Sequence, residues 1–346
     1  MGVDLGELAT RRVISLEALS GKIIAVDAFN VLYQFLASIR QEDGTPLMDF
    51  KGNITAHLSG LFYRSAKLLE NGIKPIYVFD GKPHEFKEAT NIERASIKKE
   101  AFEKWQRALE EERIEEARMY AQATSRLSQE MVEESKELLD AMGIPWMQAP
   151  SEGEAQAAIM TKEGRAYAVA SQDYDALLFG APVLVRNISI TGRRKVPRQD
   201  RYVMIEPEEI NLKEMLSNLG IGQEQLIIIG ILIGTDFNEG VKGVGPKTAL
   251  KIVKEKKTLD EVIGYVKKKY DYDFEVDPKD VMEIFLNPKG NPLPERFEWG
   301  GFDEGKIIEI LVERHDFSDE RVRKTIEELK KTFKEKGEQK SLGQWF

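Results

Sequence analysis

Three short apolar stretches of the chain share one pattern, KIIAVDAFN (22–30), KPIYVFDG (74–81) and AYAVASQDYD (166–175). None of them alternates apolar and polar positions, which predicts strands that are buried on both faces, as in a parallel sheet. Between them lie patterns with helical spacing, such as NITAHLSGLFYRSAKLLENG (53–72), which Gly72 closes. Strands that alternate with helices predict a doubly wound, mainly parallel α/β sheet with helices on both faces.

Acidic residues follow each predicted strand closely. Asp27 and Asp80 follow the first two, and Asp173 and Asp175 follow the third. In doubly wound sheets, ligands bind at the carboxyl ends of the strands, and all of these acids fall there. A lone Asp at such a position also serves as a cap for the next helix, so each residue taken singly has a structural interpretation as well.

Two further acidic positions belong to other elements. APSEGEAQAAIM (149–160) contains Glu152 and Glu154 at the start of a predicted helix, where Ser151 and Glu154 also fit a capping box. Asp236 follows LIIIGILIG (226–234), the longest apolar run of the chain. That run is roughly half as long as a membrane helix requires, so we expect an intracellular protein without a membrane partner.

Composition narrows the chemistry of such an acidic site. The chain has no cysteine and three histidines, so a metal site would consist of oxygen ligands. Carboxylates this close need neutralising cations, and oxygen ligands favour Mg²⁺ or Mn²⁺ over zinc. Two such ions are a known device for phosphodiester cleavage. The net charge of −9 by itself argues against a nucleic-acid partner, unless the acids gather in one place. The charged fraction of 32%, without cysteine, hints at a heat-adapted source.

At these residues the sequence resembles the flap endonucleases of the structure-specific 5′ nuclease family, and most closely their archaeal members. The resemblance covers nearly the whole chain. It is carried by MGVDLGEL, VDAFNVLYQFL, VFDGKP, APSEGEAQAA, SQDYDALLFG and GTDFNEGVKGVGPKTAL. The seven metal-site carboxylates of the family fall on Asp27, Asp80, Glu152, Glu154, Asp173, Asp175 and Asp236.

The resemblance implies an enzyme that removes 5′ flaps from DNA with two Mg²⁺ ions, for which Mn²⁺ can substitute. It also implies 5′-3′ exonuclease activity and roles in Okazaki fragment maturation and base excision repair. The charged stretch of about residues 83–130 would be the helical arch of the family, although a solvated helical insertion gives the same pattern. Lys87 and Arg94, which are seven residues apart on one helix face, match arch residues that point into the active site.

Further residues would hold the DNA. GVKGVGPKTA (240–249) predicts the turn of a helix-hairpin-helix element (about 226–255), in which Lys242, Gly243, Gly245 and Lys247 contact a phosphate backbone. A plain helix-turn-helix is the alternative, and the family adds a monovalent cation at this hairpin. Tyr33 matches a residue that stacks on a base beside the scissile phosphate, although an ordinary core tyrosine fits as well. The basic cluster TGRRKVPRQ (191–199) predicts a turn or hairpin whose role stays open.

The chain ends in QKSLGQWF (339–346), which places two aromatic residues at a terminus. Gln339, Leu342, Trp345 and Phe346 follow the spacing of the box with which proteins bind the DNA sliding clamp. The last three would share one face of a helical turn. The polar stretch before them, TFKEKGEQK, predicts a flexible tether. We therefore expect a nuclease domain over residues 1–338 and a clamp-binding tail over residues 339–346.

Three alternatives remain at this point. A related 5′ nuclease could prefer gaps, bubbles or four-way junctions, but the predicted arch lacks the very long insertion that some relatives carry. A non-catalytic, clamp-bound adaptor could bind DNA junctions, but it would gain nothing from seven acids that face phosphates. A ribonuclease of the wider α/β class is less consistent with a helix-hairpin-helix element, which favours a DNA duplex.

Overall fold

A computed structural model describes residues 2–41, 44–87, 100–101, 103–105, 107–108, 120, 124, 126–190, 192–195 and 202–342, without the side chains of residues 193–195, 202 and 333–342. Most of the predicted arch, including Arg94, therefore lies outside the described residues. Its described part begins with the short 3₁₀ helix η2 (Glu85–Lys87).

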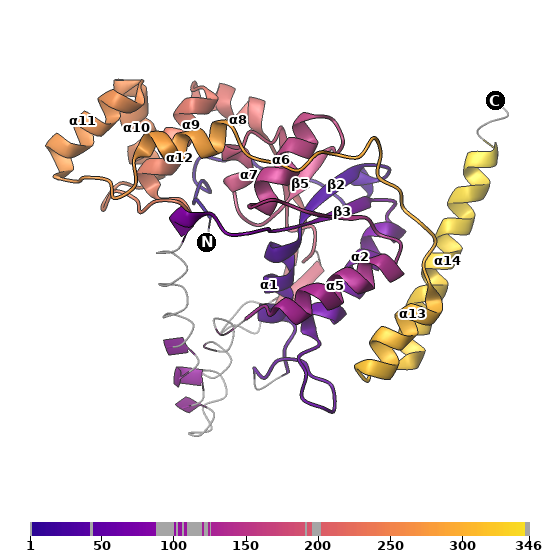
Figure 1. Cartoon of the computed structure of the whole chain (residues 1–346). Helices are drawn as coiled ribbons and strands as arrows, with labels where there is room; N and C mark the ends of the chain where they lie inside the picture. Colours follow the sequence, from indigo (N-terminus) through magenta and orange to yellow (C-terminus); the bar gives the residue numbers. More distant parts are fainter. Residues whose placement is uncertain are drawn as a thin grey trace.

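A seven-stranded sheet forms the centre of the molecule (Figure 1). Its strands, in spatial order, are β1 (Arg12–Val13), β9 (Glu208–Asn211), β6 (Val183–Arg186), β5 (Ala168–Ala170), β2 (Ile23–Asp27), β3 (Lys74–Phe79) and β4 (Trp146–Gln148). The strands from β6 to β4 are parallel, and β9 and β1 extend the sheet with antiparallel pairs. The three stretches identified from the sequence are β5, β2 and β3, so the predicted sheet is confirmed.

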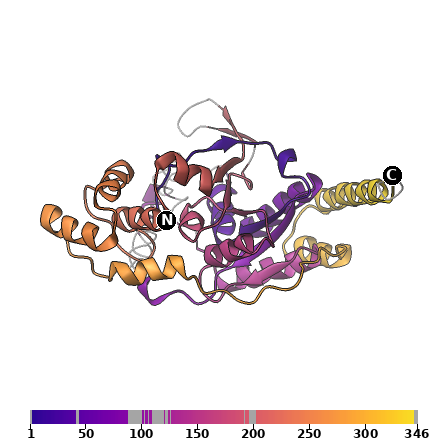
Figure 2. The ribbon, with the colours of Figure 1, turned by 90° about the horizontal axis from the view of Figure 1, so that it is seen from above.

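Helices cover both faces of this sheet (Figures 1 and 2). On one face lie α1 (Ala28–Ser38), α2 (Ala56–Glu70) and α5 (Gln129–Ala141), and on the other lie α6 (Gly153–Lys162), α7 (Asp175–Leu178) and α9 (Gln223–Ile233). Along β3, Tyr77 and Phe79 enter the first of these cores while Ile76 and Val78 enter the second. Apolar side chains are therefore needed at consecutive positions, because both faces are buried.

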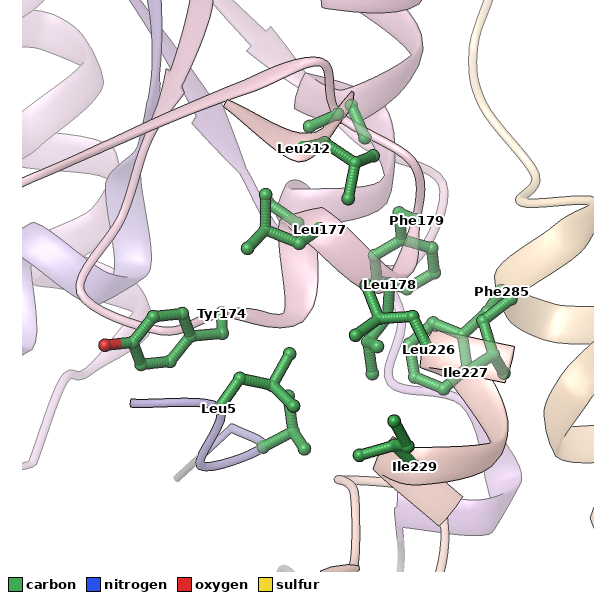
Figure 3. Packing of buried hydrophobic residues seen from close by; sticks show 14 of the residues in the cluster. Leu5, Tyr174, Leu177, Leu178, Phe179, Leu212, Leu226, Ile227, Ile229 and Phe285 are labelled. Carbon is green, nitrogen blue, oxygen red and sulfur yellow. The ribbon is translucent and has the colours of Figure 1, made fainter. Parts of the chain in front are cut away.

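A helical lobe continues the second core away from the sheet. It consists of α8 (Leu212–Leu219), α9, α10 (Pro246–Lys256), α11 (Leu259–Tyr270) and α12 (Pro278–Leu286). Figure 3 shows how Leu226 and Ile227 of α9 and Phe285 of α12 pack against Leu178 and Phe179. Among the described residues no single helix is long and apolar enough to span a membrane. Only α8 and α9 taken together reach that length and composition, and they are bent by 82°.

An extended segment, residues 287–303, leads from this lobe along strand β4 to the C-terminal helices. Asn291 Nδ2 donates to Gln148 O at 2.8 Å, Trp299 Nε1 donates to Pro75 O at 2.9 Å, and Gly300 N donates to Gly143 O at 3.0 Å. The segment thereby covers an edge of the sheet that would otherwise be open to pairing. The chain then forms α13 (Glu304–Ile308), the π-helical turn η3 (Glu309–Arg314) and α14 (Asp319–Leu342).

Two small elements complete the described fold, the 3₁₀ helix η1 (Glu17–Leu19) and a separate antiparallel hairpin of β7 (Gly192–Lys195) and β8 (Tyr202–Ile205). The hairpin includes part of the basic cluster 191–199, of which residues 191 and 196–199 lie outside the described residues. Of the turn and the hairpin considered for this cluster, the structure shows a hairpin.

The close contact of α1 and α2 generates a stability prediction. A Cβ atom added at Gly60 would lie 2.1 Å from the buried ring of Phe35, whereas one added at Gly264 on α11 meets open space. We expect Gly60→Ala to lower the free energy of unfolding by about 1–3 kcal/mol through overpacking. Gly264→Ala should raise it by about 0.5–1 kcal/mol, because alanine favours the helix. Denaturant unfolding of both variants checks this, and equal effects would contradict the close contact.

Candidate active site

Four carboxylates stand at the carboxyl edge of three adjacent parallel strands. Asp27 is the last residue of β2, Asp80 follows β3, and Asp173 and Asp175 follow β5. The capping interpretation of Asp27 is also correct, because its Oδ1 accepts a hydrogen bond from Asn30 N at 3.0 Å at the start of α1. Because the strands are parallel and neighbouring, their ends bring these side chains to one place.

Helix α6 adds two carboxylates from its first turn. Glu152 is the N-cap residue but makes no side-chain cap, and Glu154, two positions further in the first turn, is half-buried. The capping box considered for Ser151 and Glu154 is wrong, because the Ser151 hydroxyl instead donates to Glu152 Oε1 at 3.3 Å. The first backbone N–H group of the helix is used by another carboxylate: Gly153 N donates to Oδ1 of Asp80, which follows β3, at 2.7 Å.

The seventh carboxylate, Asp236, comes from the helical lobe, just after α9. It contributes to the raised pKa values of Asp80 and Asp175, which places it beside the strand-end acids. Its neighbour Phe237 packs against Phe285 of α12, with ring centroids 5.4 Å apart. The position of Asp236 therefore depends on how the lobe packs against the sheet.

Burial and mutual repulsion raise the pKa values of several of these acids. Burial and the charge of Asp236 raise the pKa of Asp175 to about 7, and burial and Glu152 raise that of Asp80 to about 6. Burial is also the largest cause of the raised pKa values of Asp27 and Glu154, and neighbouring acids add to it. Glu154 Oε1 is buried without a hydrogen-bond partner. The cluster thus carries negative charge that calls for cations.

Lys87 supplies positive charge within the cluster. Its ammonium contacts Glu152 Oε2 and lies 3.1 Å from Asp236 Oδ2. Burial lowers the pKa of Lys87, but Glu152 and Asp236 outweigh that effect, so the pKa is raised overall. Lys87 is the last residue of η2, so the structure shows it on a 3₁₀ turn. The shared helix face with Arg94 cannot be followed, since Arg94 lies outside the described residues.

The donor set of the cluster fits hard divalent cations. All seven candidate ligands are carboxylates, which Mg²⁺ and Mn²⁺ prefer, and one buried oxygen of Glu154 lacks a partner. In the described part of the chain, however, no group of three or more acidic or histidine side chains is arranged to hold an ion as it stands. The Lys87 ammonium lies between Glu152 and Asp236 and pairs with these two candidate ligands.

Groups that the sequence interpretation left without a role hold the acids in place. Asn30 Nδ2 donates to Asp173 Oδ2 at 3.1 Å, and Val3 N donates to Asp175 Oδ1 at 2.8 Å. A Cβ atom at Gly2 would lie 2.4 Å from Asp175 Oδ2, so the N-terminal segment requires glycine there. The motifs MGVDLGEL and VDAFN contain these residues, but their contacts span more than 140 positions and cannot be read from spacing.

The predicted hairpin element has the expected local geometry. Gly243 has φ of +83°, and Gly245 is the N-cap of α10, which begins with Pro246. Lys242 and Lys247 are exposed. Their side chains are therefore accessible to a phosphate, and the N-terminus of α10 favours an anion at the same place. Tyr33, on α1, is 36% exposed, which agrees better with a surface contact than with an ordinary core tyrosine.

The C-terminal region differs from one expectation. The stretch TFKEKGEQK continues helix α14 to Leu342, so the predicted flexible tether is wrong for these residues. Lys and Glu are good helix formers, and they outweigh the single Gly337. Gln339 and Leu342 lie in the last turns of this helix, whereas Trp345 and Phe346 lie outside the described residues.

A candidate DNA contact that the sequence interpretation missed is Phe50, whose side chain is 95% exposed. It lies in LMDFKGN (47–53), between α1 and α2. The signal was a large aromatic residue inside a turn-forming Asp, Gly and Asn sequence, where an apolar side chain has no core to enter.

Comparisons with known proteins agree with this geometry. Residues 4–101 match the XPG N-terminal domain and residues 143–236 match the XPG I-region. Flap endonuclease 1 of Aeropyrum pernix is 55% identical and that of Staphylothermus marinus is 52% identical, with 100% of each chain covered in both cases. The solved structure of flap endonuclease-1 from Methanococcus jannaschii is 41% identical. It has a TM-score of 0.74, with 97% of this chain and 100% of that chain covered.

These matches extend over the sheet, the helical lobe and all seven acidic positions. At this identity over its full length, the chain belongs to the flap endonuclease family of metal-dependent, structure-specific nucleases.

Proposed function

We propose that this chain is a Mg²⁺-dependent 5′ flap endonuclease with 5′-3′ exonuclease activity that acts in DNA replication and repair. The observation that carries the proposal is the convergence of seven carboxylates, from the ends of three strands, the start of α6 and the loop after α9. A protein that only bound DNA would lose affinity by directing these acids at phosphates. Membership of a nuclease family supports catalysis in the same way.

In this proposal, Asp27, Asp80, Glu152, Glu154, Asp173, Asp175 and Asp236 hold two Mg²⁺ ions, directly or through water. The chemistry that such ions supply when bound is activation of a water molecule and stabilisation of the leaving oxygen. Asn30, Val3 and Gly153 orient three of the carboxylates through hydrogen bonds, which preorganises the site.

Lys87 and Arg94 would stabilise the negative charge that develops on the transferring phosphate. The position of Lys87 supports this role, because its ammonium lies among the carboxylates and is held over the Phe237 ring, 5.3 Å from its centroid. A cation already aimed at the reacting group helps the transition state more than the ground state.

The rest of the surface would select the shape of the DNA. The hairpin with Lys242, Gly243, Gly245 and Lys247 would hold a duplex backbone, with a monovalent cation at its carbonyl groups. Tyr33 would stack on a base near the cut, and Phe50 would stack on the end of a duplex at the junction, since an exposed aromatic ring suits an unpaired base face. The tail 339–346 would bind the DNA sliding clamp.

The function is tested with labelled double-flap DNA beside a pseudo-Y, a four-way junction and plain duplex, each with Mg²⁺ and with chelator. We expect cleavage of the double flap that depends on Mg²⁺ and exceeds cleavage of the other substrates. Preferential cleavage of the four-way junction would assign the chain to a different substrate class, and no cleavage of any substrate would exclude the nuclease function.

Asp175→Asn should abolish cleavage while junction binding survives. It should also stabilise the metal-free protein. The pKa of Asp175 is about 7 when folded and about 3.9 when unfolded, so its ionisation costs stability as pH rises between these values. The gain in melting temperature in chelator should therefore be larger at pH 8 than at pH 5. Glu320→Gln, an exposed control, should show no such gain. Cleavage near the wild-type rate would contradict the assignment.

Lys87→Ala should slow single-turnover cleavage by about 10²–10³-fold with little change in the dissociation constant measured in Ca²⁺. Arg94→Ala should behave alike. Lys82→Ala is a matched control, because Lys82 is exposed and lies five positions before Lys87. If the Lys87 variant loses affinity but cleaves normally once saturated, Lys87 only tethers DNA.

Deletion of residues 339–346 should leave cleavage unchanged in the absence of the sliding clamp and should remove stimulation by the clamp. Replacement of Trp345 and Phe346 by Ala should reproduce the effect. A deletion variant that binds the clamp with unaltered affinity would refute the role of the tail.

A further inference from the structure

The loop that carries Phe50 is tightly folded although its aromatic side chain is exposed. Met48 and Ile54 form an antiparallel bridge across its base. Inside the loop, the Asp49 carboxylate accepts hydrogen bonds from Lys51 N at 2.9 Å, from Asn53 N at 2.8 Å and from Asn53 Nδ2 at 2.8 Å. The exposure of Phe50 is therefore a property of an ordered loop, which we call the Phe50 loop (residues 48–54).

Three consecutive residues just before α14 hold this loop from outside. Asp316 Oδ2 accepts a hydrogen bond from Phe50 N at 3.0 Å, and Arg314 O accepts one from Lys51 Nζ at 3.5 Å. Between them, His315 Nδ1 lies 3.4 Å from Asp49 Oδ2. These contacts join positions more than 260 residues apart in the sequence. The loop is therefore held by residues outside it as well as by its own hydrogen bonds.

His315 also connects the loop to the core. Its Nε2 lies 3.3 Å from Glu134 Oε1 on α5, and Glu134 Oε2 lies 3.1 Å from His57 Nε2 on α2. His315 is 7% exposed, and the side chains of Asp49 and His57 are fully buried. The adjacent charged groups Arg314, Glu137 and Glu309 pair with one another and with Lys306, so their charges are largely balanced locally.

The electrostatics favour a protonated His315 between two carboxylates. Hydrogen bonding to Glu134 is the largest cause of the raised pKa of His315, and Asp49 adds to it. Burial raises the pKa of Glu134, but hydrogen bonds with His315 and His57 outweigh burial and lower it to about 2. Below the raised pKa of His315, one imidazolium therefore bridges the anions of Asp49 and Glu134, and each contact is charge-assisted.

We propose that His315 is a positioning residue for DNA recognition, whose imidazolium between Asp49 and Glu134 fixes the Phe50 loop in the orientation that meets a duplex end. This inference rests on the proposed function, in which Phe50 stacks on DNA. It assigns the rigidity of that contact to a residue that itself touches no DNA. A loop that is already rigid loses little conformational entropy when it binds DNA. Loss of the His315 contacts should therefore weaken DNA affinity more than it slows cleavage.

The direction of the pH dependence follows from the raised pKa of His315. The stabilisation by the imidazolium is fully present below the unfolded value of about 6.5 and is lost as pH rises through the higher folded value. Affinity for flap DNA should therefore weaken in wild-type protein above that folded value. Below that folded value, His315→Gln should bind flap DNA more weakly than wild-type protein, and its affinity should lack this step.

The experiment compares His315→Gln with Phe50→Ala, with the double variant and with the control Glu313→Gln, which is exposed and two positions away. Hydrogen exchange of the Phe50, Lys51 and Asn53 amides reports on the loop. In His315→Gln we expect these amides to exchange about tenfold faster or more, because hydrogen bonds to charged groups are lost. The dissociation constant should rise as in Phe50→Ala, and the saturated single-turnover rate should be unchanged.

The double variant distinguishes positioning from general destabilisation. If His315 acts through Phe50, the double variant binds no more weakly than Phe50→Ala alone. Should His315→Gln fold poorly, Asp49→Asn keeps the acceptor for the loop amides, removes the charge, and should show the same exchange and binding effects. Additive losses in the double variant, or unchanged exchange in the loop, would overturn the inference. Failure of the proposed function would differ, since wild-type protein would then not cleave flap DNA.

Discussion

The repulsion among seven carboxylates at one edge of the sheet is the constraint on which the rest of the structure depends. Burial and like charges raise the pKa values of Asp27, Asp80, Glu154 and Asp175, so assembling the site opposes folding. The fold offsets this cost with fixed hydrogen-bond donors and with the ammonium of Lys87 between two of the acids. The same unfavourable charge makes the site suitable for divalent cations, because ions that bind there relieve the repulsion.

Two hydrophobic cores, one on each face of the sheet, keep the acids together. Alternate residues of β2 and β3 enter opposite cores, so the strand ends are fixed from both sides. The lobe core also fixes the remaining partners, because Phe86 packs against it beside Lys87 and Phe237 packs within it beside Asp236. The His84 ring lies 5.7 Å from the Phe237 ring, which links the turn of Lys87 to the loop of Asp236. A packing defect in the lobe would therefore reach the site.

The Phe50 loop also combines local and distant contacts. Its internal hydrogen bonds determine its shape, but the residues before α14 determine its orientation. At the carboxylate site and in the Phe50 loop, the residues that would meet DNA belong to short segments of the chain. The residues that hold these segments in place come from distant parts of the sequence. Local segments can supply chemistry, but only packing between segments can supply rigidity.

The sequence by itself determined the elements and the chemistry. Apolar runs without alternation identified β2, β3 and β5, since a strand buried on both faces must be apolar at consecutive positions. The four acids after those runs, with Glu152 and Glu154 at a helix start and with Asp236, make up the seven carboxylates. The family resemblance agreed with the comparisons.

Only the tertiary structure decided how these parts meet. The capping box at Ser151 and the flexible tether before residue 339 are local patterns that were wrong, because a local pattern is compatible with more than one environment. Three contacts join residues that are 65 to 266 positions apart in the sequence. They are the contact of Lys87 with Glu152, the hydrogen bond from Val3 to Asp175, and the contact of His315 with Asp49. Contacts at such separations depend on how helices and strands pack, and periodicity along the chain carries no information about them.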